Sequence, residues 1–498
     1  MIDEDGQLDK KPPIFSLSIR LMYGRIHKIK TAEKTPEHRE GFIFMSEKKK
    51  LSTGKVWCFA IGQFGWSIQS ALISNFLVNY YQPDPSAVEA GQTVFIPQGL
   101  VIFGILTILG AITWFGRIFD AVTDPWIASK SDRCKSKDGR RIPFMRMAAI
   151  PFALATIFAY WSPVNGESWL NALFLFIMLT LFYLFMTMYC TPYNALIPEL
   201  GTDQKTRMAI STAISFTFIA GMAVAYTAPM VWGMLEGMVG DRVTAIRITF
   251  TVMSLIGLLC MFVPVFTIKE KEYVTAQPSE STALKSLAAT FRNKDFRIFV
   301  ASDIVYFLGI TMFQTAMLYF VTALLKLDEG MSTIYFVGMT ALSVLFYPVV
   351  SKLTPKFGKK KLILVAFGIF TVAFAYTAAL GTFLPVAPEI QGYILCLLAA
   401  PAMAIFGILP QAVVADIAEC DEIETHENRS GMFYAARTFS MKMGQAVAML
   451  LVTSLGTIRQ DIGLGYRIVA ICAAAVCVLG GALFMMYNEK RVYSKIMK

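Results

Sequence analysis

Charged residues are scarce in this sequence: they make up 16% of 498 residues, whereas hydrophobic residues make up 55%. A water-soluble protein of this length needs no such apolar composition, so lipid is the expected solvent for much of the chain. The net charge of +10 does not indicate a nucleic-acid partner, because the basic residues gather in loops between long apolar runs. We therefore expect a membrane protein that binds no nucleic acid.

Histidine and paired cysteine are scarce as well. The three histidines are scattered, and none of the eight cysteines belongs to a CxxC pair. We therefore expect no structural metal, no disulfide framework and no cofactor. The sequence also lacks a GxxxxGK[ST] loop, which an ATP-driven pump would need, and it lacks the Ser/His/Asp or metal-ligand spacing of an enzyme.

What the sequence has instead is apolar runs of about 20 residues or more, the length that crosses about 30 Å of hydrocarbon. None shows the short alternating pattern of barrel strands, so each run is predicted to be a helix, which satisfies its own backbone in lipid. We predict an all-α membrane protein with twelve transmembrane helices. The spans are 56–81, 99–127, 144–162, 169–196, 209–234, 247–267, 298–325, 332–354, 361–384, 390–415, 432–455 and 466–487.

The distribution of Lys and Arg among the loops sets the predicted topology. Basic residues follow the second span, at 130–141, and the eighth span, at 352–361, and loops of this kind stay in the cytoplasm. The segment 82–98 contains no Lys or Arg, so it is predicted to lie outside. Both termini are then cytoplasmic, and we expect a multi-pass protein of the cell (inner) membrane.

The same basic loops suggest an internal duplication. SKSDRCKSKDGRR (129–141) and SKLTPKFGKKK (351–361) each follow the second span of a six-span half. Two related halves would enclose a midplane site that opens alternately to either side, although basic cytoplasmic loops can also recur by chance. The predicted parts are a basic, disordered segment 1–50, in which Met45 offers a second start, an N-terminal half 51–268, a cytoplasmic linker 269–297, a C-terminal half 298–487 and a basic tail 488–498.

Three charged residues interrupt the second span. The motif GRIFDAVTDP (116–125) contains Arg117, Asp120 and Asp124, and a charge at the centre of a span costs about 2.5–3.5 kcal/mol on insertion scales. Asp120 and Asp124 are four residues apart and share a helical face, where their carboxylates can converge on a cation such as Na⁺ or share a proton. The alternative is that Arg117 merely neutralises Asp120.

The eleventh span also contains charge, at Arg437 and, near its middle, at Lys442. A lysine at this depth cannot easily reach water, so it needs a carboxylate partner. We predict that Lys442 pairs with Asp120 or Asp124 across the two halves, and that breaking and remaking this pair couples their movements. A static buried pair is the alternative.

An acidic run closes the tenth span on the predicted cytoplasmic side. It consists of Asp416, Glu419, Asp421, Glu422, Glu424 and Glu427. The run is either a solvated loop or a gate that clamps the basic loops through ion pairs. The predicted gate residues are Asp132, Arg133, Arg140, Arg141, Asp416, Glu419 and Glu422.

Four motifs occur together in the chain: RIFDAVTDP (117–125), SDRCKSKDGRRIPF (131–144), PYNALIPEL (192–200) and VVADIAECDEIETHENRSG (413–431). In this combination, over most of residues 51–487, the sequence resembles the glycoside-pentoside-hexuronide:cation symporters of the major facilitator superfamily. The resemblance implies a fold of two six-helix halves and symport of a sugar or sugar derivative with Na⁺ or H⁺. It also implies cation ligands at Asp120, Asp124, Thr123 and Thr187, and coupling through Lys442 and Arg117.

The sequence departs from the melibiose-transporting members of that family at the sugar site. Where those members have two aspartates, an arginine and a tryptophan, ungapped matching places Ser67, Cys190, Ser215 and Asn194. A melibiose-like disaccharide is therefore not expected. Arg437 stands where the family has glutamine, and its added positive charge favours an anionic solute such as a hexuronide.

Polar and aromatic side chains within the spans are the remaining candidates for contact with the solute. Inside a helical bundle such side chains more often form hydrogen bonds between helices, which is the alternative for each of them. The candidates are Trp66, Ser67, Gln69, Asn75, Cys190, Tyr193, Asn194, Gln314, Arg437 and Thr438.

The sequence thus predicts a secondary active transporter that works by alternating access. Its expected partners are a small polar solute, most simply a carbohydrate, a monovalent coupling cation and the lipid bilayer, and it is expected to act as a monomer. The alternatives are a transporter of lysolipids or other amphiphiles from the same superfamily, and a membrane sensor that has lost transport.

Overall fold

The computed structural model describes residues 51–201, 203–274, 290–382, 385–426 and 430–496. The predicted N-terminal segment 1–50, with the alternative start at Met45, and most of the predicted linker lie outside these ranges. The described chain is helical, and its extended backbone is limited to two isolated bridges in loops.

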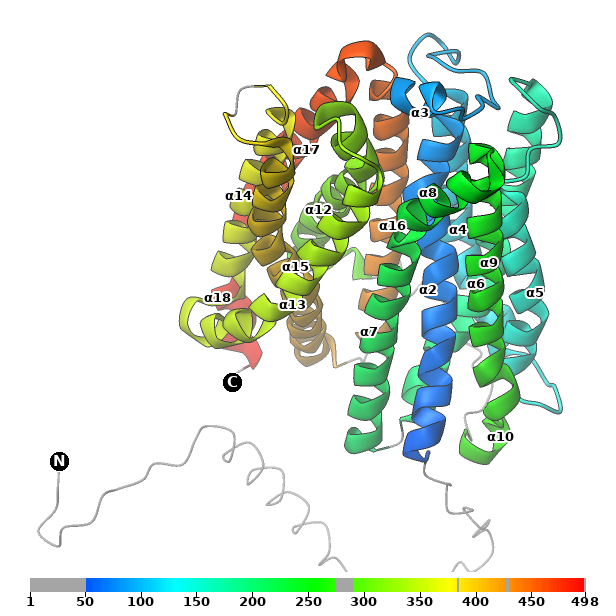
Figure 1. The fold of residues 1–498 in the computed structure, drawn as a ribbon. Helices are drawn as coiled ribbons and strands as arrows, with labels where there is room; N and C mark the ends of the chain where they lie inside the picture. The colour runs from blue at the N-terminus through cyan, green and yellow to red at the C-terminus, as the bar shows by residue number, and fades with distance from the viewer. Residues whose placement is uncertain (1–50, 202, 275–289, 383–384, 427–429, 497–498) are drawn as a thin grey trace, which may run out of the picture. The chain divides into compact units, whose positions relative to one another are not determined.

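Twelve long helices occupy the positions of the twelve predicted spans (Figure 1). Those of the N-terminal half are α2 (Thr53–Tyr81), α4 (Ile108–Asp132), α5 (Ile142–Phe158), α6 (Trp169–Leu200), α7 (Gln204–Tyr226) and α9 (Arg242–Thr267). Those of the C-terminal half are α12 (Lys294–Tyr319), α13 (Gly330–Phe357), α14 (Lys359–Ala378), α15 (Pro388–Thr425), α16 (Ser430–Leu455) and α17 (Leu464–Met485). The shorter elements are α3 (Pro85–Glu89), α8 (Ala228–Val239), α10 (Glu270–Tyr273), α18 (Glu489–Ile496), the π-helical turn η1 (Phe320–Leu324) and the 3₁₀ turn η2 (Gln460–Ile462).

Nine helical segments of the described chain are long and apolar enough to cross a membrane. The helix α5 is shorter, with 17 residues. The helices α4 and α16 are absent from the nine because charged side chains interrupt their apolar surface. Contact with lipid therefore does not explain the charged side chains of these two helices.

The predicted second span begins too early. Residues 99–107 form a loop, in which Gly99, Phe103 and Gly104 have positive φ angles of 87°, 53° and 68°. A helix cannot pass through such left-handed positions. The helix α4 instead begins at Ile108, where the Thr107 hydroxyl accepts a hydrogen bond from the Gly110 amide at 3.0 Å.

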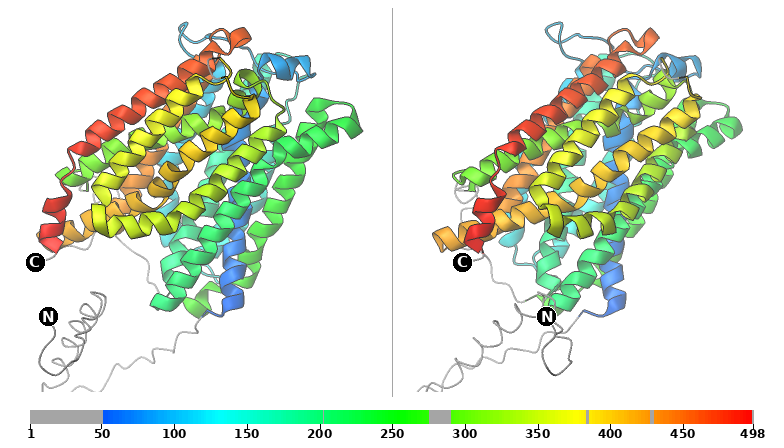
Figure 2. Two further views of the ribbon diagram at one scale, coloured as in Figure 1. Left: turned by 60° about the vertical axis from the view of Figure 1, so that its left-hand side comes forward. Right: turned by 90° about the vertical axis from the view of Figure 1, so that its left-hand side faces the viewer.

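The two halves repeat one packing plan. In the first half α2 packs against α7 and α9, α4 against α6, and α5 against α6 and α9. In the second half α12 packs against α16 and α17, α13 against α15, and α14 against α15 and α17. Helices of equal rank thus have equivalent neighbours. The halves meet through α4 with α16, α2 with α12, and α7 and α8 with α13, and Figure 2 shows the helices of the second half, yellow-green to red, running side by side.

The repetition extends to the helix ends. The Glu270 carboxylate, in α10, accepts hydrogen bonds from the backbone amides of Arg140, Arg141 and Ile142 at 2.8, 2.8 and 3.1 Å, where α5 begins. The Glu489 carboxylate, in α18, accepts them from Lys359 and Lys360 at 2.7 and 3.3 Å, where α14 begins. Each glutamate supplies negative charge to the N-terminus of the third helix of its half. This contact and the packing plan both support the predicted duplication.

The ends of the helical bundle differ in what they carry. In Figure 1 α3 lies at one end, at the top, and α10 and α18 lie at the other. We call these the α3 end and the α10 end. Both basic loops, 129–141 and 351–361, lie at the α10 end, next to the glutamates just described.

Candidate functional site

A charged cluster joins α4 of the first half to α16 of the second. The Lys442 ammonium lies 2.9 Å from Asp120 Oδ1 and 2.6 Å from Asp124 Oδ2. Asp120 is fully buried and Lys442 is 8% exposed. The contact predicted between Lys442 and the two carboxylates is therefore present, and it ties the two halves together at the middle of both helices.

Threonines of α6 complete the cluster. The Thr187 hydroxyl donates to Asp120 Oδ1 at 2.8 Å, and the Thr191 hydroxyl lies 3.3 Å from Asp124 Oδ1. Thr191 was not among the predicted ligands. The spacing identifies it, because Thr187 and Thr191 are four residues apart, as are Asp120 and Asp124. Each of the two helices therefore places its pair of side chains on one face. Thr123, a predicted ligand, instead donates to the Phe119 carbonyl of its own helix at 2.9 Å.

One oxygen of this cluster has no partner. Asp120 Oδ2 is buried and accepts no hydrogen bond from the residues that the structure describes. An unsatisfied buried group costs about 1–3 kcal/mol, and more when it is charged. Two carboxylates facing one ammonium also leave a surplus of negative charge. Hard carboxylate and hydroxyl oxygens around an uncompensated charge suit a small monovalent cation, so the residues present fit the ion that the sequence predicts.

Arg117 does not neutralise Asp120. Its Nη2 donates to the Ser74 hydroxyl at 2.8 Å, and its guanidinium lies 5.3 Å from the centre of the Tyr183 ring. Within the described chain it forms no ion pair with either aspartate of the cluster, so that alternative is wrong. The positive charge that reaches the aspartates comes from the other half of the molecule.

Arg437 does not bring an unpaired positive charge to the site. Its Nε and Nη2 donate to the two oxygens of Asp303, on α12, at 2.7 and 3.2 Å. Arg437 is 8% exposed and Asp303 is 4% exposed. A carboxylate of the same half therefore balances Arg437, which removes the reason for expecting an anionic solute. Asp303 was not among the predicted site residues, although it is the single acid within the seventh span.

Several predicted solute contacts are contacts between or along helices. The side chains of Ser67, Gln69 and Tyr193 are fully buried. Gln69 Nε2 donates to the Ser254 carbonyl at 2.8 Å and the Tyr193 hydroxyl to the Phe59 carbonyl at 2.8 Å, so both join helices. The Ser67 hydroxyl donates to a carbonyl of its own helix at 2.6 Å. The structural alternative therefore accounts for these three residues.

The other predicted contacts are less enclosed. Trp66, Cys190 and Gln314 are half-buried, and Asn194 and Thr438 are exposed. The indole nitrogen of Trp66 is buried without a partner in the described chain. Asn75 is buried, and its amide nitrogen has no partner there either. The hydroxyl of Thr438 donates to a backbone carbonyl of its own helix at 3.0 Å.

The predicted gate residues pair within each half. Glu199 Oε1 lies 3.1 Å from both Arg140 and Arg141, and Arg141 also pairs with Asp132. In the second half Asp416 pairs with Lys359 at 2.6 Å. In these pairs each acid contacts the basic loop of its own half. Arg133 and Glu419 are exposed and Glu422 is half-buried, while Glu427 lies outside the described residues.

Contacts between the halves also gather at the α3 end. The Tyr319 hydroxyl, on α12, donates to the Gln82 carbonyl at 2.6 Å. Glu329, at the start of α13, accepts hydrogen bonds from Trp232 at 2.7 Å and from Arg242. The two halves are thus in contact at the α3 end and at the Lys442 cluster.

Twelve long helices in two matching halves, joined by a buried cluster of opposite charges, define a multi-pass membrane transporter of the major facilitator fold. Residues 58–486 match the family model described as MFS/sugar transport protein, and the chain belongs to this family.

Curated relatives of the chain span bacteria and a vertebrate. An uncharacterized symporter of Bacillus subtilis (strain 168), YnaJ, is 25% identical over 80% of this chain and 81% of its own length. The glucuronide carrier protein homolog of Escherichia coli (strain K12) is 19% identical over 80% and 82%. The sodium-dependent lysophosphatidylcholine symporter 1-A of Danio rerio is 21% identical over 90% and 88%.

A solved structure confirms the fold. The crystal structure of a D-xylose-proton symporter matches with a TM-score of 0.60 and 15% sequence identity, over 88% of this chain and 98% of that one. At this identity the likeness concerns the fold alone.

Proposed function

We propose that the protein is a cation-coupled symporter that carries a small polar solute, a carbohydrate, by alternating access. The observation that carries this proposal is the position of the Lys442 ammonium between two carboxylates of the other half, with Asp120 Oδ2 left unpartnered. A charge that holds two mobile halves together, and that a mobile ion can replace, is the physical requirement for coupling.

The proposed cycle follows from competition for the carboxylates. A Na⁺ ion or proton that reaches Asp120 and Asp124 removes the charge that holds Lys442, so the contact between α4 and α16 weakens. The two halves can then move relative to each other, and Lys442 returns when the ion leaves. Thr187 and Thr191 keep the carboxylates oriented throughout, because they belong to the same half.

The proposed orientation follows from the basic loops. They lie at the α10 end, so that end and both termini would face the cytoplasm of a cell membrane, and the α3 end would face outwards. The described contacts at the α3 end would then close the outer side, while the solute leaves on the inner side.

A neutral sugar is favoured over a hexuronide because Asp303 balances Arg437. The family description and the glucuronide carrier relative support a carbohydrate. The half-buried and exposed candidates Trp66, Cys190, Asn194 and Gln314 are the proposed contacts. A lysolipid is the second candidate, supported by the relative from Danio rerio, which matches over most of both chains.

The test is uptake into proteoliposomes of labelled neutral sugars, uronides and lysophosphatidylcholine, each with a Na⁺ gradient, a pH gradient or none. We expect gradient-driven accumulation of a neutral sugar, and loss of the gradient dependence but not of solute exchange in Asp124→Asn. Uptake of the lysolipid alone would reject the sugar, and unchanged gradient dependence in Asp124→Asn would reject the cation site.

A further inference from the structure

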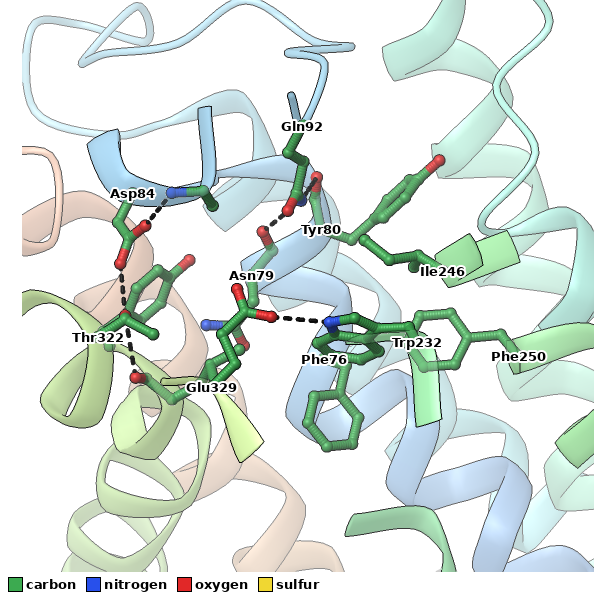
Figure 3. A pocket seen from close by; sticks show the side chains of 13 residues that line it. Phe76, Asn79, Tyr80, Asp84, Gln92, Trp232, Ile246, Phe250, Thr322 and Glu329 are labelled. Atoms are coloured by element: carbon green, nitrogen blue, oxygen red, sulfur yellow. Dashed lines mark hydrogen bonds between the residues drawn. The ribbon is translucent and has the colours of Figure 1, made fainter. Parts of the chain in front are cut away.

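A cavity lies between the two halves at the α3 end, away from the Lys442 cluster (Figure 3). From the first half α2, α3, α8 and α9 line it, and from the second half η1 and the residues flanking it. The water-accessible volume of the cavity is about 20 Å³. This is enough for one water molecule or one small ion, and too little for a sugar.

Asn79 points to an occupant of this cavity. The residue lines the cavity and is 7% exposed, and both its amide nitrogen and its amide oxygen are buried without a partner among the described residues. A buried amide left in this way is costly, so such groups normally bind water, an ion or a ligand. The unpartnered oxygen is a hard ligand of the kind that alkali-metal ions prefer.

The charges around the cavity are not balanced. Asp84 is 3% exposed, accepts hydrogen bonds from Thr322 and from the Ala87 amide, and forms no ion pair in the described chain. Glu329 has Arg242 as its cation, but Arg242 is shared with Glu236, to which it is bonded at 3.0 Å. Glu329 and Glu236 therefore share one guanidinium, the nearby Arg247 is bonded to the lining residue Tyr80, and Asp84 has no ion-pair partner among the described residues.

Glu329 responds to its burial and to the charges around it. Burial raises the pKa of Glu329, the charge of Asp84 raises it further, and Arg242 opposes both effects. A positive ion in the cavity would relieve the repulsion. Thr322 lies in the π-helical turn η1, and wide turns of this kind often occur at functional sites. Figure 3 shows Asp84, Asn79 and Glu329 on one side of the cavity and the aromatic rings of Phe76 and Trp232 on another.

We propose that this cavity binds one monovalent cation, Na⁺ in the simplest case, through Asn79 Oδ1 and the carboxylates of Asp84 and Glu329. The ion would link α2 and α3 of the first half to η1 and α13 of the second, and so hold the α3 end closed. The site is separate from Asp120 and Asp124, so it does not depend on which ion couples transport. If the coupling ion is also Na⁺, the site lies on the side from which that ion would enter.

The experiment counts radioactive Na⁺ bound to the purified protein at saturating Na⁺, with choline chloride holding the ionic strength constant. If coupling also uses Na⁺, we expect two ions per chain in the native protein and one in Asp120→Asn/Asp124→Asn. Adding Asn79→Leu to that variant should remove the remaining ion. Because the Asn79 amide has no partner in the described part of the chain, Asn79→Leu should leave the melting temperature without Na⁺ unchanged or higher.

Matched carboxylates provide the control. Asp84 caps the N-terminus of α3 and Asp241 caps that of α9, and asparagine preserves both caps while removing the charge. In the Asp120→Asn/Asp124→Asn background, Asp84→Asn should abolish Na⁺ binding and Asp241→Asn should retain it. No bound Na⁺ in that background, meaning that the cavity holds only water, or binding that survives Asn79→Leu, would overturn the proposal. If only the proposed coupling site fails to bind Na⁺, the native protein binds one ion, and Asn79→Leu alone removes it.

Discussion

The two halves share one scaffold but treat their buried charges differently. In the C-terminal half Arg437 and Asp303 satisfy each other, on α16 and α12, through two hydrogen bonds. In the N-terminal half the cation that Asp120 and Asp124 contact, among the described residues, is Lys442 from across the interface. A pair closed within one half can stay intact while the halves move, whereas a pair shared between halves must respond to that movement. The pair of Arg437 and Asp303 can therefore be purely structural, whereas the pair formed by Lys442 can take part in the movement of the halves.

The largest effect is expected from Lys442→Met. The substitution leaves two buried carboxylates without their ammonium, and breaking a buried pair in this way costs about 3–5 kcal/mol. Because a cation can replace the ammonium, Na⁺ should restore most of the lost melting temperature if it is the coupling ion. Coupled uptake should be absent. Thermal unfolding in detergent with Na⁺ or choline measures the rescue, and equal melting temperatures in both salts would contradict a Na⁺ site.

Asp303→Ala tests the other half. It strands Arg437 and should also cost about 3–5 kcal/mol, but without rescue by Na⁺, because no cation can replace a carboxylate. The double variant Asp303→Leu/Arg437→Met removes both charges, and should recover the stability and retain coupled uptake. If the double variant loses transport while folding normally, the pair is part of the site and the contrast between the halves fails.

A smaller effect is expected from the two capping glutamates. Glu270→Gln and Glu489→Gln each remove the charge that faces a helix N-terminus, at about 1–2 kcal/mol. Glu270 is 2% exposed and accepts three backbone hydrogen bonds, whereas Glu489 is half-buried and accepts two, so Glu270→Gln should lower the melting temperature more. The reverse order would show that the two copies of this contact have diverged.

The smallest effect is that of pH on Glu329, which lies among the contacts between the halves at the α3 end. The pKa of Glu329 is raised above its usual 4.5, so its contribution to stability is fully present below that value and is lost as the pH rises through the raised pKa. As the pH rises from 4.5 through the raised pKa of Glu329, the melting temperature of the native protein in choline buffer should therefore fall relative to that of Glu329→Gln. Na⁺ in the proposed cavity should flatten the difference, and a difference that grows more favourable with pH would contradict the sign.

The fold was largely predictable because long apolar runs leave a chain in lipid few alternatives to helices. The contact between Lys442 and the aspartates was predictable for a related reason: few charges occur deep in the spans, and opposite charges there must meet. The start of the second span was not predictable from hydropathy, because the apolar residues of 99–107 hide a left-handed turn at Gly99 and Gly104.

Other parts of the site depend on which helices are neighbours. The partner of Arg437 is 134 residues away in the sequence, and nothing in the local pattern indicates that Asp303 faces it. The gate stays a prediction: complementary charge alone does not show which basic loop Asp416 contacts, and the structure pairs it with Lys359, in the loop of its own half. The helical spans predict how deep a residue lies in the membrane, but only the packing of the helices shows which side chain lies next to it.

The contacts of Glu270 and Glu489 bear on whether the two halves need to be joined in one chain. Glu270 lies before residue 275 and Glu489 lies after residue 290, so each half carries its own cap on its own side of the connection between them. The first half also includes Tyr273, whose hydroxyl accepts a hydrogen bond from Lys55 at 2.8 Å. A gene split between residues 275 and 290 would thus encode two fragments that each keep the glutamate contact of their half, and the co-expressed fragments should assemble.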